Sequence, residues 1–264
     1  METIPFGFSP CPNDTFAFHA LVHGLAPGVA VTPHLADVEE LNRLALTGEL
    51  PLTKLSFHAL ARVRDRYRLL NAGAALGRGC GPLVVARPGF DPRDLGRVTV
   101  AAPGRLTTAH LLLALYLGRP PLVEPMLFSR VMERVAAGDF AAGLIIHEGR
   151  FTYPSHGLTE VVDLGRWWEE ATGLPIPLGA IAARRDLGEP RIARLEEALA
   201  ASVAHAFAHP GDSRDYVAAH AQEMDPTVQE SHIALYVNHY TLDLGAEGRA
   251  AVDELFRRAD ELAL

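Results

Sequence analysis

Short apolar segments alternate with helical patterns along most of the chain, and this alternation constrains the fold more than any other feature. In the first unit, residues 4–9 form an apolar run, residues 10–14 a turn with two prolines, and residues 15–23 an apolar helical pattern. Asn13 or Asp14 is expected to cap that helix, because their side-chain oxygens can accept hydrogen bonds from its first N–H groups. Strands that alternate with helices predict an α/β fold with mainly parallel sheets.

Two restarts of this pattern predict two lobes. A new strand, turn and helix begin near residue 97, and a further strand is expected at residues 178–183. Residues 1–87 and 179–264 are therefore expected to form a larger discontinuous lobe, and residues 88–178 a smaller one. A length of 264 residues is sufficient for two lobes of this kind.

Polar residues follow several of the predicted strands. In open parallel sheets, ligands bind outside the carboxyl ends of the strands. A cleft between two lobes would collect the loops at those ends. Four loops are expected to face it: Ser9–Asp14, Lys54–Ser56, Gly104–Thr108 and His147–Tyr153.

Composition and charge exclude several classes of protein. A net charge of −8 and a pI near 5.8 argue against a nucleic-acid partner, because such proteins concentrate basic residues. No stretch approaches 18 apolar residues, so membrane insertion is not expected. Residues 1–5 lack the features of a secretory signal, which predicts a cytoplasmic protein. The two cysteines, Cys11 and Cys80, are expected to be buried thiols. The sequence leaves the oligomeric state open.

The sequence lacks the common motifs for metals and cofactors. His147 and Glu148 begin like the zinc motif H-E-x-x-H, but Phe151 stands where the second histidine is needed. The glycines of residues 77–81 do not complete a dinucleotide fingerprint, and neither a P-loop nor a G-x-S-x-G elbow is present. We therefore expect no cofactor and no metal.

His147 is the strongest candidate for a catalytic residue. It follows an apolar strand at residues 141–146, where its side chain is expected to reach the cleft. A histidine with a near-neutral pKa is suited to act as a general base. The alternative is a structural histidine between the lobes, and the chain has 12 histidines.

Two further loops are candidates for holding an anionic ligand. Thr107 and Thr108 follow a Pro-Gly turn and open an apolar helix, whose N-terminus can bind a carboxylate. They can equally be ordinary helix caps. Lys54, the one lysine among 24 basic residues, and Ser56 could likewise bind an anion in the cleft. Alternatively, Lys54 is a solvated charge and Ser56 caps the helix that begins at Phe57. Asn13 and Asp14 could either cap the first helix or hydrogen-bond substrate hydroxyls.

Four segments together carry a resemblance to a known family. They are Ser9–Phe16, Leu52–Ser56, Pro103–Thr108 and Gly143–Glu148, and the match continues through residues 150–154 and 173–175. In this combination the chain resembles the 1,4-dihydroxy-6-naphthoate synthases, enzymes of the futalosine route to menaquinone.

The resemblance implies a fold, a reaction and a set of site residues. The fold would be a two-lobed type II periplasmic-binding-protein-like fold with a ligand cleft between the lobes. The reaction would convert cyclic dehypoxanthinyl futalosine to 1,4-dihydroxy-6-naphthoate with release of dihydroxyacetone, so the partner would be a small-molecule carboxylate. His147 would be the proton acceptor. The implied substrate contacts are Lys54, Leu55, Ser56, Thr107 and Thr108.

Two other functions stay open at this point. The fold is shared with transport receptors, so a solute-binding module is one alternative. The other is the related chorismate dehydratase of the same pathway. The Ser9–Asp14 turn and the Ile145–Glu148 strand end favour the naphthoate synthase.

Overall fold

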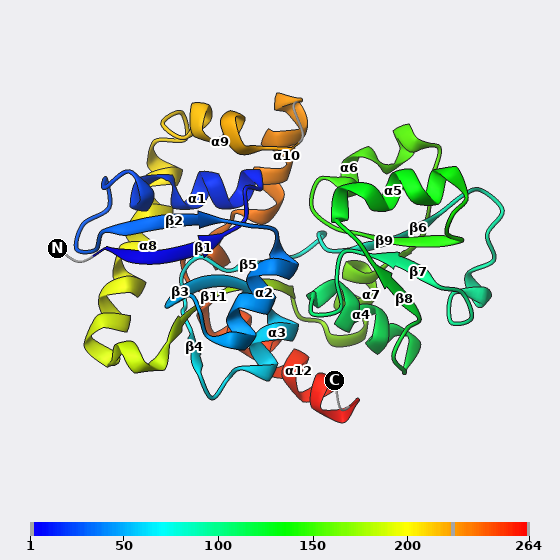
Figure 1. The fold of residues 1–264 in the computed structure, drawn as a ribbon, viewed down its shortest axis with the longest axis horizontal. Coiled ribbons are helices and arrows are strands. Elements are labelled where there is room, and N and C mark those ends of the chain that lie inside the picture. Colours follow the sequence, from blue (N-terminus) through cyan, green and yellow to red (C-terminus); the bar gives the residue numbers. More distant parts are fainter. Residues whose placement is uncertain (1–2, 223–224, 263–264) are drawn as a thin grey trace.

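The chain forms two lobes that lie side by side, each built around one β-sheet (Figure 1). The structure is a computed structural model that describes residues 3–222 and 225–262. Met1 and Glu2, which belong to the segment used to predict a cytoplasmic location, lie outside the described residues.

The larger lobe contains a mixed sheet with the strand order β2-β1-β3-β11-β4, and β5 pairs with β11. Strands β2, β1 and β3 are parallel, whereas β11 is antiparallel to β3, β4 and β5. The strands are β1 (Ile4–Phe8), β2 (Val31–Leu35), β3 (Leu52–Ser56), β4 (Tyr67–Leu69), β5 (Ala75–Gly77) and β11 (Ile176–Arg184).

The smaller lobe repeats this plan with the order β10-β6-β9-β7-β8. Strands β8, β7 and β9 are parallel, whereas β6 is antiparallel to both β9 and β10. The strands are β6 (Leu83–Ala86), β7 (Val100–Ala102), β8 (Val123–Pro125), β9 (Ala142–Ile145) and β10 (Thr159–Asp163).

The prediction of mainly parallel sheets is wrong, and the reason is the way the chain crosses between the lobes. Strands β6 and β11 are the first strands after each crossing, and each joins the last parallel strand in the opposite direction. Strand β6 also pairs within the smaller sheet, although it precedes the predicted boundary at residue 87.

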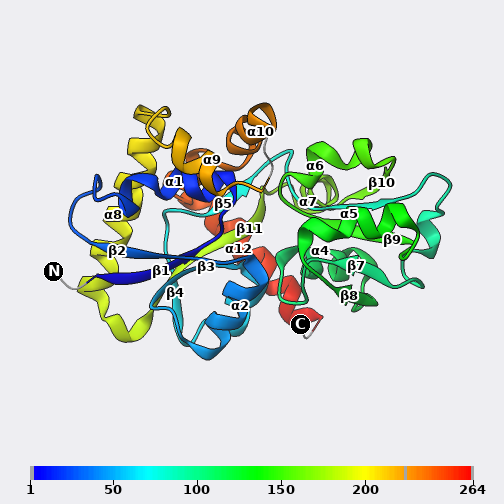
Figure 2. The same cartoon turned by 45° about the horizontal axis from the view of Figure 1, so that its top comes forward.

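Helices cover both sheets. In the larger lobe they are α1 (Pro12–Val22), α2 (Val38–Thr47), α3 (Phe57–Arg62), α8 (Glu189–Ala208), α9 (Arg214–His220), α10 (Pro226–Tyr236), α11 (His239–Leu242) and α12 (Gly245–Glu261). In the smaller lobe they are α4 (Thr108–Leu117), α5 (Phe128–Ala137), α6 (Gly149–Thr152) and α7 (Leu164–Thr172). Short 3₁₀ turns lie at Pro92–Asp94, Tyr153–His156 and Arg185–Leu187. Helix α10 stands at the boundary between the lobes (Figures 1 and 2).

The start of α1 differs from the sequence prediction. Cys11 is the N-cap, and Pro12 occupies the first helical position, where the fixed φ of proline suits a helix. Asn13 and Asp14 therefore lie in the first turn instead of capping it. This placement leaves the Asp14 carboxylate free to accept hydrogen bonds from other side chains.

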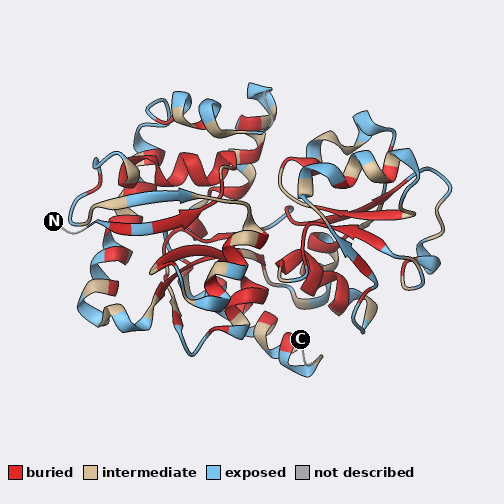
Figure 3. Ribbon diagram, viewed as in Figure 1, coloured by how far each residue is buried: buried red, intermediate tan, exposed pale blue. Residues whose placement is uncertain are grey.

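Each lobe has a buried core, and the exposed residues lie on outer helix faces, on loops and on the edge strands β2, β8 and β10 (Figure 3). In the larger lobe, the rings of Phe6, Phe8 and Phe18 pack with centroids 4.9–5.5 Å apart. In the smaller lobe, Trp168 is fully buried and donates a hydrogen bond to the Pro175 carbonyl. The largest hydrophobic cluster includes residues of both lobes, so the two cores are continuous.

Candidate functional site

A cavity lies between the lobes where the strand ends meet. All four loops predicted to face a cleft contribute to its lining, together with the start of β11 and helix α10. The lining residues are Asn13, Val38, Lys54, Ser56, Ala75, Gly81, Pro82, Thr107, Thr108, Ala109, Ile146, His147, Leu178, Gly179, His232 and Tyr236.

Lys54, which lines this cavity, belongs to a buried ion pair of the larger lobe. The Lys54 ammonium donates to Asp14 Oδ1, and both side chains are almost fully buried. Asp14 Oδ2 also accepts hydrogen bonds from the Ser9 N–H at 3.2 Å and the Ser9 hydroxyl at 2.7 Å. The one lysine of the chain is thus neutralised by a carboxylate from the first turn of α1.

His147 projects from the end of β9 with an unusual backbone conformation. Its φ of +55° is in the left-handed region, and it is the one non-glycine residue with positive φ in the described part of the chain. Its ring centroid lies 5.0 Å from that of Phe128 and 6.1 Å from that of His232. Burial, and next the positive charge of Lys54, lower its pKa to about 4. The imidazole is therefore neutral at pH 7 and has a free lone pair to accept a proton.

His232 is a second histidine at the cavity, and the sequence analysis missed it. Its Nε2 lies 2.9 Å from Asn13 Oδ1, while the Asn13 amide nitrogen donates to Asp14. Since the Asn13 oxygen is thus an acceptor, Nε2 carries the proton and Nδ1 is unprotonated. That buried Nδ1 has no hydrogen-bond partner among the described residues and lies 4.0 Å from Glu148 Oε2. Helix α10 is far along the chain from every predicted strand end, so no local sequence pattern indicates that His232 reaches the cavity.

Tyr236 follows His232 by one helical turn and lies on the same face of α10. The two ring centroids are 4.7 Å apart, and both residues line the cavity. Burial raises the pKa of the Tyr236 phenol, which keeps it neutral. Helix α10 thus adds two ring systems that analysis of the strand ends could not find.

The threonines at the start of α4 are already engaged by the protein. Thr107 caps the helix: its hydroxyl accepts from the His110 N–H at 3.2 Å and donates to the Gly104 carbonyl at 3.0 Å. The Thr108 hydroxyl accepts from the Phe57 N–H at 3.0 Å and donates to the Leu178 carbonyl at 2.6 Å. Thr108 therefore connects the smaller lobe to the larger one.

Glu39 also connects the lobes at this point. Its carboxylate accepts hydrogen bonds from the N–H groups of Arg105 at 3.0 Å and Leu106 at 3.2 Å. Gly104 permits this approach, because a Cβ there would lie 2.2 Å from Glu39 Cδ. Burial raises the pKa of Glu39. The turn before α4 does bind a carboxylate, but that carboxylate belongs to the chain itself.

Two of the remaining predicted contacts differ in position. Ser56 lines the cavity. Its N–H donates to Asn42 Oδ1 at 2.8 Å, and its hydroxyl accepts a hydrogen bond from Asn42 Nδ2 at 3.1 Å. Leu55 is fully buried in the hydrophobic core and does not line the cavity. Alternation along β3 explains the difference, because neighbouring side chains point to opposite faces.

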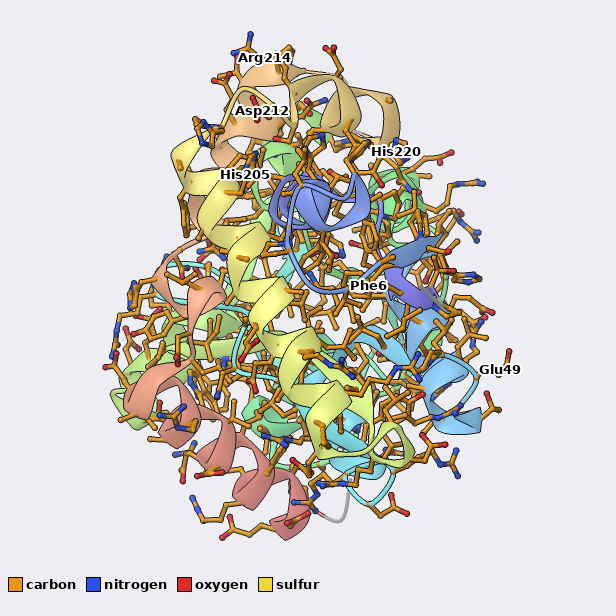
Figure 4. All side chains as sticks on the ribbon, turned by 90° about the vertical axis from the view of Figure 1, so that its left-hand side faces the viewer. Phe6, Glu49, His205, Asp212, Arg214 and His220 are labelled. Carbon is orange, nitrogen blue, oxygen red and sulfur yellow. The ribbon has the colours of Figure 1, made fainter. Side chains whose placement is uncertain are left out.

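Other histidines lie away from the cavity, among them His205 and His220. Figure 4 shows His205 and Asp212 close together and His220 nearby, at one end of the larger lobe. His205 Nε2 lies 3.0 Å from Asp212 Oδ2. None of these residues lines the cavity between the lobes.

One group of possible metal ligands lies beside the cavity. Cys11, His147 and Glu148 each offer a ligand atom, and these atoms all lie within 4.8 Å of one another. It is the one group of this kind in residues 3–222 and 225–262. The sequence motifs did not predict it, because Cys11 is distant from the other two in the chain.

A protein-family model described as menaquinone biosynthesis matches residues 4–261, almost the whole chain. The chain belongs to this family.

Helices long and apolar enough to cross a membrane are absent from the described part of the chain.

Curated relatives identify the protein as an enzyme. The chain is 57% identical to a 1,4-dihydroxy-6-naphtoate synthase of Thermus thermophilus over 265 residues, which covers 100% of this chain and 96% of the relative. A 1,4-dihydroxy-6-naphtoate synthase of Streptomyces coelicolor is 48% identical over 98% of this chain and 93% of its own length. The resemblance inferred from the four segments is confirmed.

Solved structures confirm the fold. A protein from Archaeoglobus fulgidus matches with a TM-score of 0.90 and 36% identity, covering 99% of this chain and 98% of that one. A Candida albicans protein described as having the generic periplasmic binding protein fold matches with a TM-score of 0.69, 12% identity and coverage of 100% and 92%. The chain has a periplasmic-binding-protein-like fold, with the cavity between its two lobes.

Proposed function

We propose that the enzyme converts cyclic dehypoxanthinyl futalosine to 1,4-dihydroxy-6-naphthoate and dihydroxyacetone, in the futalosine route to menaquinone and in the cytoplasm. The observation that carries the proposal is His147 at the cavity wall, with a neutral ring whose pKa is lowered to about 4. The names of the curated relatives support the same product.

The reaction needs a base more than it needs a redox group. In a retro-aldol-like step, His147 removes a proton from a substrate hydroxyl, and the carbon–oxygen double bond that forms releases the electrons of the adjacent carbon–carbon bond. The departing fragment carries those electrons as an enolate and then takes up a proton. A positioned base of this kind contributes about 10²–10⁴-fold to the rate.

The proposed substrate contacts are Lys54, Leu55, Ser56, Thr107 and Thr108. Because the hydroxyls of Thr107 and Thr108 are engaged by the protein, the backbone N–H groups at the start of α4 are the better donors to a substrate carboxylate. Lys54 and Ser56 also line the cavity. Leu55 can contribute through its backbone, since its side chain lies in the core.

The decisive experiment is to incubate the purified protein with cyclic dehypoxanthinyl futalosine and to measure both products. Equal amounts of the naphthoate and dihydroxyacetone are expected. Saturable binding without product would favour a solute-binding module, which the shared fold makes the second candidate. Dehydration of chorismate, with no turnover of the cyclic substrate, would favour the related chorismate dehydratase.

A further inference from the structure

Three residues of different chemistry meet beside the cavity. Cys11 is the N-cap of α1 in the larger lobe, whereas His147 and Glu148 follow β9 in the smaller lobe. Their sulfur, ring nitrogen and carboxylate oxygen lie within 4.8 Å of one another. The group therefore spans the two lobes and includes the proposed catalytic base.

These donors match the preferences of zinc. Zinc binds thiolate, imidazole and carboxylate ligands, and in a tetrahedral site neighbouring ligand atoms are about 3.3–3.8 Å apart. Small side-chain rotations would bring atoms within 4.8 Å to that spacing. Three protein ligands leave a fourth position for water or another donor, as in zinc sites that exchange a ligand.

A fourth nitrogen lies nearby. His232 Nδ1 is buried, has no hydrogen-bond partner among the described residues and is 4.0 Å from Glu148 Oε2. The bond between Nε2 and Asn13 keeps Nδ1 unprotonated, so it can donate a lone pair. This nitrogen is a second observation, independent of the three-residue group, that points to a missing ligand.

The local charges also suit a cation. Lys54 is paired with Asp14, so its positive charge is balanced, while Glu148 adds a negative charge. The group also lies near a second cavity, which Glu148 lines together with Phe128 and Ser129.

We propose that Cys11, His147 and Glu148 bind one zinc ion and that the bound ion inhibits the enzyme. The inhibition rests on the proposed function of His147, because the ion takes the lone pair that would accept the substrate proton. The Cys11 thiol releases one proton to water as the zinc–sulfur bond forms, and no electron is transferred. The site would make the enzyme sensitive to free zinc.

The binding test uses cobalt, because a cobalt–thiolate bond gives a charge-transfer absorption band. The full-length protein should bind one equivalent of Co²⁺ with this band, and Zn²⁺ should abolish it by displacement. Cys11→Ser should lose the band, whereas Cys80→Ser, which changes the other buried cysteine, should keep it. A wild-type protein without the band, or a Cys11→Ser variant that retains it, would overturn the proposal.

Calorimetry and kinetics complete the test. Cys11→Ser and Glu148→Gln should each weaken zinc binding by about tenfold or more. Zinc should lower the kcat of the wild type, because the bound ion occupies the base, and should lower it less in Cys11→Ser. A kcat that zinc saturation leaves unchanged would refute the inhibition. If the protein lacks turnover on the cyclic substrate but shows the Cys11-dependent band, the proposed function fails and the metal site stands.

Discussion

The two polar regions of the cavity differ in how far their hydrogen bonds are satisfied. At the start of α4, both threonine hydroxyls are engaged and Glu39 occupies the turn that precedes the helix. On α10 and after β9, by contrast, His232 Nδ1 has no partner among the described residues, and His147 makes no described ring hydrogen bond. We call the first region the clasp (Glu39, Arg105, Leu106, Thr107 and Thr108) and the second the histidine region (His147 and His232).

This difference separates structural from chemical roles. A group whose hydrogen bonds are filled by the protein stabilises the fold, and substrate must displace a partner to use it. A buried nitrogen without a partner lowers stability, so its presence calls for a function. We therefore expect substitutions in the histidine region to change turnover, and those in the clasp to change stability.

The largest effect is expected from His147→Ala. Loss of the proposed base should lower kcat by about 10²–10⁴-fold while the melting temperature changes little. Steady-state kinetics and thermal unfolding measure the two quantities. His34→Ala, at an exposed position on β2, is the matched control and should keep wild-type turnover. Near-normal kcat in His147→Ala would remove this residue from the mechanism.

The next largest effect is expected from Lys54→Met. Removing the ammonium leaves the Asp14 carboxylate buried without its ionic partner, which should cost about 3–5 kcal/mol of unfolding free energy. The same change should raise the pKa of His147, because Lys54 lowers it and Asp14 raises it. Since only neutral His147 accepts a proton, kcat/KM rises with pH through that pKa, near 4 in the wild type, and this rise should move to higher pH.

Two variants control this prediction. Asp14→Asn removes the charge that raises the pKa of His147, so its kcat/KM profile should move in the opposite direction. Lys54→Arg keeps the charge but replaces a compact ammonium with a planar guanidinium, and it should weaken binding or turnover. A Lys54→Met profile that coincides with the wild type would show that His147 is not electrostatically coupled to this pair.

A smaller effect is expected from Glu39→Ala in the clasp. The N–H groups of Arg105 and Leu106 would lose their acceptor, which should lower the unfolding free energy by about 1–3 kcal/mol. Chemical denaturation measures the loss, and small-angle scattering should show a more open pair of lobes. Glu40→Ala, next to it on the exposed face of α2, is the control and should change neither quantity. Equal losses in both variants would contradict the role of Glu39 in connecting the lobes.

Local sequence patterns predicted most of the elements, and tertiary contacts account for what they missed. The apolar segments predicted at residues 4–9 and 141–146 are confirmed as β1 and β9, within one residue at each end, because short apolar runs bounded by turns are a local signal. The three-residue strands β4 and β5 were missed, since pairing with β11 defines them. The direction of β11 depends on the crossing between lobes, which is equally non-local.

The candidate site shows the same division. The strand-end rule found His147, Lys54 and the start of α4, because position along the chain indicates which edge of a sheet a loop reaches. It could not find His232, whose place at the cavity depends on how α10 packs. It also could not find that Glu39 fills the turn before α4, because that contact joins two lobes.

The smallest effect is expected from Thr107→Val. This substitution separates the contribution of the Thr107 hydroxyl from that of the backbone N–H groups at the start of α4. The substitution removes the N-cap hydroxyl that accepts from the His110 N–H, which should lower the unfolding free energy by about 1 kcal/mol. Thr107→Ser keeps the hydroxyl and should retain most of the wild-type stability. Substrate affinity should be nearly unchanged in both variants, because the proposed carboxylate contact uses backbone N–H groups. A clear rise in substrate Kd for Thr107→Val, without loss of stability, would instead assign the hydroxyl to the substrate and place Thr107 with His147 among the residues that act on it.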